Sequence, residues 1–434
     1  MVTTPAIMKI RLLAILILLA LAPRALAADD TRNAVYDEHV RSLQVFEGDA
    51  LFTEPGTAAM VLGDDRGIRV EFDILADDRQ YLRYSVTHCN ADWRPSGLAY
   101  MEYVDGFNEG QVEDYAYSEV TGVHYVHYTI RIPDGQMRPL ISGNYLLRVW
   151  DEADGPDRPL LQCRFVVTEQ TADVTGAVSG RTDIDYNRGH QQLSLAVDTR
   201  RAGIRSPFSD LIVSIEQNGR ADNAVTLTRP LRVQGTTAIY EHDPKLIFTA
   251  GNEYRRFETA TLSYPGMGIG SMDFISPYYH ATVMTDKSRA AESYHYDQTQ
   301  NGGFTVREYN HDIPESALAA DYVVTHFTLD YPETPGLSFF IDSDAFQRRL
   351  GPESMMHFNR ATGRYELTAL LKQGQYSYQY LAVPLGAGAG THARTDVLEG
   401  DHFETRNLYR VYVYRRVPGD RYDRLIGVAT LRYQ

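Results

Sequence analysis

The stretch IRVEFDI, residues 68–74, decides the class of fold. Its apolar residues Ile68, Val70, Phe72 and Ile74 alternate with charged ones, which is the period of a strand with one buried face and one wet face. The same period returns along the chain in short segments separated by glycine, proline and aspartate: 128–132, 145–149, 161–167, 193–197, 211–215, 323–331, 365–369, 376–382 and 409–416. Strands that follow one another in this way favour β-sandwiches over alternating strands and helices. The sequence therefore predicts an all-β protein with little helix, built from tandem immunoglobulin-like β-sandwich domains.

Breaks in this strand pattern divide the chain into predicted domains. A polar, glycine-rich stretch at 168–183 holds little that could be buried, so we place the first boundary there. The pattern then restarts, and Asn218-Gly219 is the best tight-turn signal because both residue types tolerate a positive φ. A short helix is predicted at 315–321. The predicted domains are an N-terminal sandwich at 28–168, a middle β-rich domain at 169–312 and a C-terminal immunoglobulin-like sandwich at 313–434.

The first 27 residues have the three parts of a secretory signal peptide. Lys9 and Arg11 precede an unbroken apolar run at 12–22, and the sequence at 25–27 fits the small-residue cleavage pattern. The apolar run is shorter than the stretch of about 20 residues that crosses a bilayer. We therefore expect a cleaved signal peptide at 1–27, export, and no direct membrane insertion.

Charge and cysteine usage narrow the class of protein further. The formal net charge is −15, which excludes a general nucleic-acid binder because that class needs surplus basic residues to neutralise phosphates. In an oxidising compartment, Cys89 and Cys163 could form a disulfide. Strand parity favours two separate thiols instead, since Cys163 shares the apolar face of its strand whereas Cys89 falls on the polar side.

Motifs with catalytic or metal-binding chemistry are weak or missing in this sequence. His124 and His127 fall on opposite faces of a predicted strand, so they cannot share one metal ion. The acidic loop at 151–157 lacks the glutamate and the spacing of a calcium loop, and no metalloprotease motif or nucleophile elbow occurs. The carboxylates of EGDHFE, residues 399–404, leave a hydrolase as an alternative. We expect no enzyme activity, no cofactor, no metal and no small-molecule ligand.

Tyrosines alternate in two of the predicted strands, and they support two interpretations. The segments YSYQYLAV (376–383) and YRVYVY (409–414) could line a sheet face with rings that stack on sugars. The protein would then be a periplasmic or cell-surface glycan-binding sandwich, acting through Tyr376 and Tyr378. The other interpretation is packing, because a tyrosine buries its ring and keeps its hydroxyl near water.

Three longer segments carry a family resemblance. They are THCNADWRPSGLAYMEYVDGFNEGQVEDY (87–115), HYTIRIPDGQMRPLISGNYLLRVW (127–150) and EGDHFETRNLYRVYVYRRVPGDRYDRLIGVATL (399–431). The sequence resembles the type IX secretion system plug proteins over nearly its whole length, with HCNADW the most specific motif and 172–310 the least distinct part. The resemblance implies a non-enzymatic periplasmic subunit without cofactors. Such a subunit binds the outer-membrane β-barrel translocon of that system and plugs its periplasmic opening.

Six residues of the resembling segment are candidates for contact with that partner. Their spacing departs from strand alternation, so some of the large side chains are expected to be exposed. The candidates are Asn90, Asp92, Trp93, Met101, Tyr103 and Phe107. In the alternative interpretation, Trp93 and Phe107 close the end of the first sandwich.

Overall fold

The computed structural model of the protein describes residues 30–52, 54–311, 315–387 and 391–433. Strands make up 46% of the chain and helices 4%, which confirms the predicted all-β class. The signal peptide predicted at 1–27 lies outside the described residues. Within them, no helix has both the length and the apolar character needed to cross a membrane.

The first sandwich uses one continuous stretch of chain. One sheet runs in the order β1 (Ala34–Val35), β12 (Leu161–Thr168), β11 (Gly143–Asp151), β5 (Leu82–Cys89) and β7 (Gly110–Gln111), with β3 (Ala58–Val61) parallel to β12. The other sheet is β2 (Val40–Glu47), β4 (Ile68–Ile74), β9 (Val126–Ile132) and β8 (Asp114–Tyr117). A ribbon of β6 (Val104–Gly106) and β10 (Met137–Pro139) follows the 3-10 turn η1 (Tyr100–Glu102). The alternation of IRVEFDI is confirmed, since its four apolar side chains are buried between the sheets.

The second sandwich joins strands from two distant parts of the chain. One sheet holds β13 (Asp173–Ser179), β14 (His190–Asp198), β18 (Thr237–Tyr240) and β17 (Arg232–Gln234), with β19 (Ile247–Thr249) also paired to β14. The other holds β16 (Val225–Leu227), β15 (Leu211–Gln217), β30 (Leu408–Arg415) and β31 (Arg424–Arg432). The short helix α2 (Pro207–Asp210) connects the two sheets between β14 and β15, and the 3-10 turn η2 (Pro244–Leu246) lies between β18 and β19. At the predicted tight turn, Asn218 and Gly219 have φ values of 51° and 73°.

The third sandwich packs its sheets around the longest strand of the protein. This strand, β29 (Gly374–Pro384), pairs with β20 (Arg255–Glu258), β24 (Phe304–Val306) and β26 (Leu337–Asp342). The facing sheet runs β21 (Ile269–Ile275), β22 (Tyr278–Val283), β25 (Tyr322–Asp330), β28 (Arg364–Lys372) and β27 (His357–Asn359), with β23 (Asp286–Lys287) on β25. The predicted short helix is α3 (Ser316–Ala319), and a 3-10 turn, η3 (Asp344–Phe346), follows β26.

The strand pairing divides the chain differently from the predicted domains. β20 to β24 fall within 169–312, yet they pair with strands of the third sandwich. β30 falls within 313–434, yet it pairs along its length with β15, from Leu211 opposite Arg415 to Gln217 opposite Tyr409. A period of two identifies a strand but carries no information about which distant strand completes the ladder.

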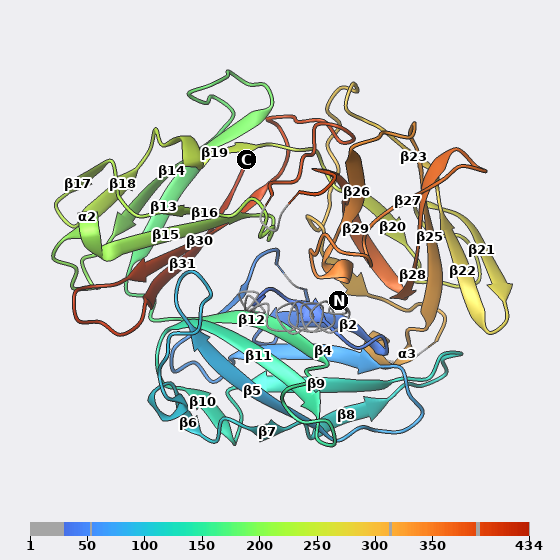
Figure 1. Ribbon diagram of the computed structural model, residues 1–434, viewed down its shortest axis with the longest axis horizontal. Helices are drawn as coiled ribbons and strands as arrows, with labels where there is room; N and C mark the ends of the chain where they lie inside the picture. The colour runs from blue at the N-terminus through green and yellow to red at the C-terminus, as the bar shows by residue number, and fades with distance from the viewer. Residues whose placement is uncertain (1–29, 53, 312–314, 388–390, 434) are drawn as a thin grey trace, which may run out of the picture.

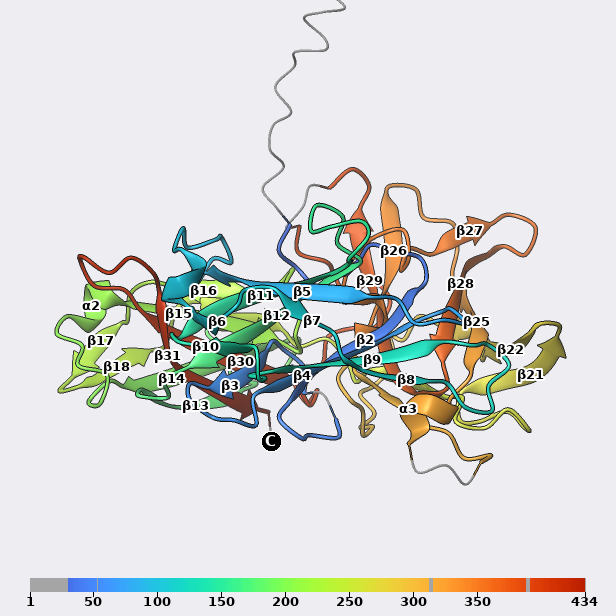
Figure 2. The same cartoon turned by 90° about the horizontal axis from the view of Figure 1, so that it is seen from below.

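The three sandwiches lie around a common centre rather than in a linear series (Figure 1). The first sandwich lies across the second and third when seen from below (Figure 2). Two segments, 250–254 and 391–407, lie between the second and third sandwiches, and Asn252 Nδ2 of one donates to Glu399 O of the other (2.8 Å). Each sandwich therefore packs against the other two.

Candidate functional site

The motif HCNADW leads from the end of β5 into a loop that the second sandwich covers. Ala91 N donates to Asp423 Oδ2 (3.0 Å), and Asp423 N donates to Asn90 Oδ1 (3.1 Å). The indole of Trp93 packs against an apolar cluster at this junction, and the guanidinium carbon of Arg164 lies 4.1 Å from its ring centroid. Asn90 and Trp93 therefore hold two sandwiches together, which differs from their predicted contact with a partner.

His88, at the start of the same motif, is buried beside residues 142–144, where β11 begins. Its Nε2–H donates to Ser142 O (3.2 Å), and Nδ1 lies 2.9 Å from Ser96 Oγ. Gly143 passes so close that a Cβ there would lie 2.2 Å from His88 Nε2. Burial lowers the pKa of His88 to about 4, so the imidazole is neutral at physiological pH.

Asn144 extends this packing to the end of the chain. Its Nδ2 donates to Asn90 O (2.8 Å), and its Oδ1 accepts from Tyr414 OH (2.8 Å). Arg424 Nε donates to Glu169 Oε1 (2.9 Å) beside it. The three segments that carry the resemblance therefore meet at one junction between the first and second sandwiches, although they are far apart in the sequence.

The remaining partner-contact candidates divide into one buried and three exposed residues. Tyr103 is buried, and its hydroxyl donates to Val86 O (3.3 Å). Asp92 is exposed, and Met101 and Phe107 have exposed fractions of 69% and 74%. The last two flank the β6–β10 ribbon together with exposed Tyr100 and Leu140, and we call these four residues the ribbon patch.

The two cysteines are buried free thiols. They lie on β5 and β12, which flank β11, opposite Asn144 and Leu147 respectively. Their side chains therefore point to opposite faces of the sheet, and the disulfide alternative does not hold in this structure. Burial raises the pKa of both thiols to about 12.

The tyrosines proposed for sugar stacking are in the core of the third sandwich. The ring of Tyr376 stacks between Phe257 and Phe304, with centroid distances of 4.9 and 5.2 Å. Tyr378 is also buried, and its hydroxyl donates to Asp286 Oδ2 (2.7 Å). A sugar cannot reach either ring, so the glycan-binding interpretation is wrong for these residues and packing explains them.

Glu399 of the EGDHFE segment is held by donors within the protein. Glu399 is buried and accepts hydrogen bonds from Arg255 Nε (3.0 Å), Arg289 Nη2 (2.6 Å) and Tyr380 N (2.8 Å). Burial would raise the pKa of Glu399, but the two guanidinium groups outweigh it and lower the pKa below its ordinary value. A carboxylate held as an anion in this way is a poor proton donor.

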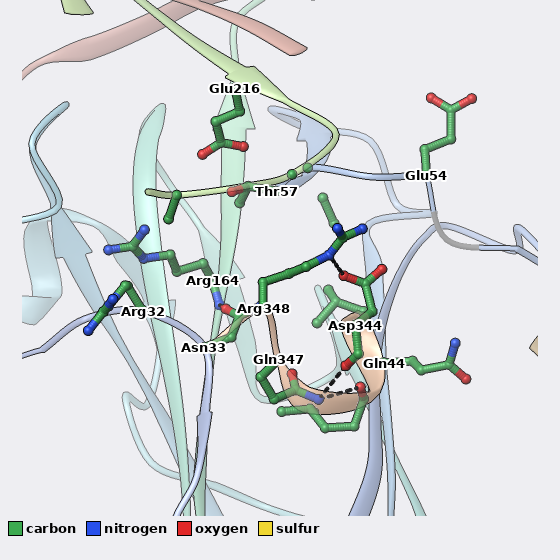
Figure 3. Close-up of a pocket in the computed structure, with 16 residues that line it drawn as sticks. Arg32, Asn33, Gln44, Glu54, Thr57, Arg164, Glu216, Asp344, Gln347 and Arg348 are labelled. Atoms are coloured by element: carbon green, nitrogen blue, oxygen red, sulfur yellow. Dashed lines mark hydrogen bonds and ion pairs between the residues drawn. The ribbon is translucent and has the colours of Figure 1, made fainter. Parts of the chain in front are cut away.

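A polar cavity of about 100 Å³ lies where the three sandwiches meet (Figure 3). Arg164 and Glu216 line it from the first and second sandwiches, and Arg348 lines it from the third. Arg348 Nε donates to Asp344 Oδ1 (2.6 Å), and its Nη1 donates to Asp342 Oδ2 (3.0 Å). Since these donors are bound to carboxylates of the third sandwich itself, they fix Arg348 at the edge of the cavity.

A second cavity, of about 170 Å³, lies between the first and third sandwiches, and a buried ion pair forms part of its lining. Lys372 Nζ donates to Asp73 Oδ2 (2.5 Å) and lies 4.1 Å from the ring centroid of Tyr125. Tyr322 OH donates to the same Asp73 oxygen (2.6 Å), and His127 Nδ1 lies 2.7 Å from Oδ1. Burial lowers the pKa of Lys372. Burial would raise the pKa of Asp73, but Lys372 and His127 outweigh it and lower that pKa.

No group of three or more His, Cys, Asp or Glu side chains could hold a metal ion within the part of the chain that the structure describes. His124 and His127 pair with different carboxylates, those of Asp77 and Asp73. The ionisable groups at the three junctions are ordered by one another, and this arrangement favours a structural role for them.

Three comparisons place the chain among known proteins. Residues 40–169 match the family profile described as Type 9 secretion system plug protein 1st domain. The crystal structure of a hypothetical protein from Parabacteroides merdae is similar at 38% identity and a TM-score of 0.88, over 92% of this chain and 99% of that chain. A protein described as a putative membrane anchored protein, from Corynebacterium diphtheriae, aligns with 92% of this chain and 59% of its own at 9% identity. Its TM-score of 0.16 is too low to indicate a shared fold. No curated protein matches the chain.

Proposed function

This chain belongs to the type 9 secretion system plug protein family, and from that premise we propose that it binds the outer-membrane β-barrel translocon of the system and plugs its periplasmic opening. The protein is exported by a cleaved signal peptide and resides in the periplasm, associated with the outer membrane through the translocon. It acts by occupying space, without catalysis and without a cofactor. The observation that carries the proposal is the family match over residues 40–169.

The architecture supports a role as a stopper. A compact chain of this length has a radius of gyration of about 22 Å, so the body is broad. Ion pairs such as Lys372–Asp73 and Arg255–Glu399 brace its junctions from within. Three sandwiches that pack against one another deform less easily than three sandwiches joined only by flexible linkers.

The exposed candidates suit a contact that forms and dissociates. The ribbon patch is small and apolar, and charged residues such as Glu102 and Arg421 lie beside it in an ion pair. Interfaces of non-obligate complexes combine an apolar centre with a polar rim. Met101 and Phe107 are therefore the sequence-predicted residues that we retain as contacts with the translocon.

Purification from native membranes tests the proposal. A tagged chain should co-purify with the translocon barrel. In a strain that lacks both this chain and any other protein that covers the barrel, large hydrophilic probes should cross the outer membrane. Recovery of the tagged chain entirely free of the barrel, in a strain that retains it, would contradict the binding step. Unchanged permeability would contradict the sealing step.

A further inference from the structure

One long edge strand of the third sandwich, β21, is paired on one side only among the described residues. β21 pairs with β22, and no strand among the described residues lies along its other side. Both views place β21 at the outer end of the third sandwich, away from the other two (Figures 1 and 2). The outward backbone N–H and C=O groups of β21 are therefore available to another strand.

The other edges of the described sheets are short or covered. β8 has four residues, and β7, β16, β17 and β27 have two or three. β2 is longer, but the third sandwich covers it, with Ser42 Oγ 2.8 Å from Tyr322 OH. β26 is covered by the segment 354–356, because Ile341 N donates to Ser354 O (2.8 Å). β13 and β31 lie against each other across the second sandwich.

β21 has a register shift between Ile269 and Ser271, which is one way of protecting an edge strand, so its regular part at 271–275 is the part open to another strand. Natural edge strands carry lysine or proline, or are very short, because an open apolar edge pairs with other chains. β21 has seven residues, IGSMDFI, with neither lysine nor proline and a single charge at Asp273. Phe274 and Ile275 have exposed fractions of 60% and 59%, and exposed Met267 and Met284 flank the strand.

We propose that the β21 edge takes up an extended strand of the translocon by β-sheet augmentation. This proposal rests on the proposed function and names the contact through which the plug is held. Backbone hydrogen bonds supply the affinity, and the side chains of the added strand supply the specificity. Phe274 and Ile275 point to opposite faces of the sheet, so the matching strand has an apolar residue on each face to cover them, and a lysine or arginine near Asp273.

Charge disfavours a second copy of this chain as the occupant. Each copy has a formal net charge of −15, and the edge itself contributes an acidic group and no basic one. Two such edges approach each other against repulsion, whereas a strand with a basic residue is attracted.

A matched pair of variants tests the edge. Lysine on an edge strand blocks pairing with another strand, so Ile275→Lys should reduce the amount of barrel that co-purifies by about tenfold. The control is Ile184→Lys, because Ile184 is an equally exposed isoleucine (63%) on a loop of the second sandwich. Hydrogen exchange of the amides at 270–275 should slow by about tenfold when the wild-type chain is bound to the barrel.

The outcomes separate this inference from the proposed function. If both variants co-purify with the barrel equally well and exchange at 270–275 is unchanged on binding, β21 is not the contact and the proposed function stands. If the wild-type chain itself does not bind the barrel, the proposed function fails and this inference fails with it. Protection of 270–275 that grows with the concentration of the isolated chain would assign the edge to a second copy and overturn the proposal.

Discussion

Gly143 shows how tightly the first sandwich is packed at its junction with the second. Its φ is 147°, and a Cβ would lie 2.2 Å from His88 Nε2. We expect Gly143→Ala to lower the free energy of unfolding by about 3 kcal/mol, because the imidazole would have to leave its hydrogen bonds. Urea unfolding followed by tryptophan fluorescence measures the change. Gly135→Ala is the control, since nothing lies within 4 Å of a Cβ there, and equal stability of the two variants would contradict the contact.

His88 makes the stability of the protein depend on pH. Burial lowers its pKa from 6.5 to about 4, so between these values the unfolded chain takes up a proton that the folded chain does not. Stability therefore falls as pH decreases from about 6.5 to 4, by about 3 kcal/mol from this group. His88→Gln should remove that part of the difference in unfolding free energy between pH 7 and pH 4.5. Replacing exposed His124 by Gln should leave it in place, and identical pH profiles for the two variants would refute the assignment.

Trp93 illustrates what residue-level patterns miss. Within a strand, the period of two predicts which side chains are buried, as it does for Phe72. Trp93 lies in a loop, where no period applies, and its surroundings come from residues more than 300 positions later, such as Tyr414 and Leu425. The sequence predicted only that some of the six candidates are exposed; the structure shows that Met101 and Phe107 are, so Phe107 does not close the end of the first sandwich.

At the scale of elements, the Lys372–Asp73 pair joins β28 of the third sandwich to β4 of the first. Lys372→Met leaves the Asp73 carboxylate buried without its cation, and we expect a loss of about 3–5 kcal/mol. The double variant Asp73→Asn/Lys372→Met removes both charges and should be clearly more stable than the single variant. Thermal unfolding by calorimetry measures all three proteins.

The control for that prediction is an ion pair of similar geometry at the surface. Arg138 Nη2 donates to Asp65 Oδ1 (2.7 Å), and both side chains are exposed. Arg138→Met should cost less than about 1 kcal/mol. A similar cost for Arg138→Met and Lys372→Met would mean that burial does not strengthen the Lys372–Asp73 contact.

The elements themselves could be predicted from the sequence, and their pairing could not. Alternation in β4, β9 and β25 is local, because each strand shows its own buried face. The ladder between β15 and β30 joins residues about 200 positions apart. Two strands with the same alternation cannot be told apart by sequence pattern, so the pattern does not predict which of them pair. Cavities that form between sandwiches are for the same reason invisible in the sequence.

For the whole molecule, strand pairing predicts which fragments fold. Residues 30–169 contain every strand of the first sandwich, so this fragment should give dispersed NMR signals and a cooperative thermal transition. Residues 313–434 lack β20 to β24 and separate β30 from β15, so this fragment should be disordered. A cooperative transition in the fragment 313–434 would show that the sheet assignment of β30 and β31 is wrong.

The return of β30 and β31 to a sheet begun by β15 and β16 also sets the order in which the protein can be completed. In a chain that emerges from its N-terminus, the first sandwich can close as soon as β12 has appeared, whereas the second must wait for the last strands. A nascent chain that stalls or is clipped before residue 408 presents an open, apolar sheet to proteases and chaperones. A chain cut before residue 408 should therefore be degraded faster than the full chain.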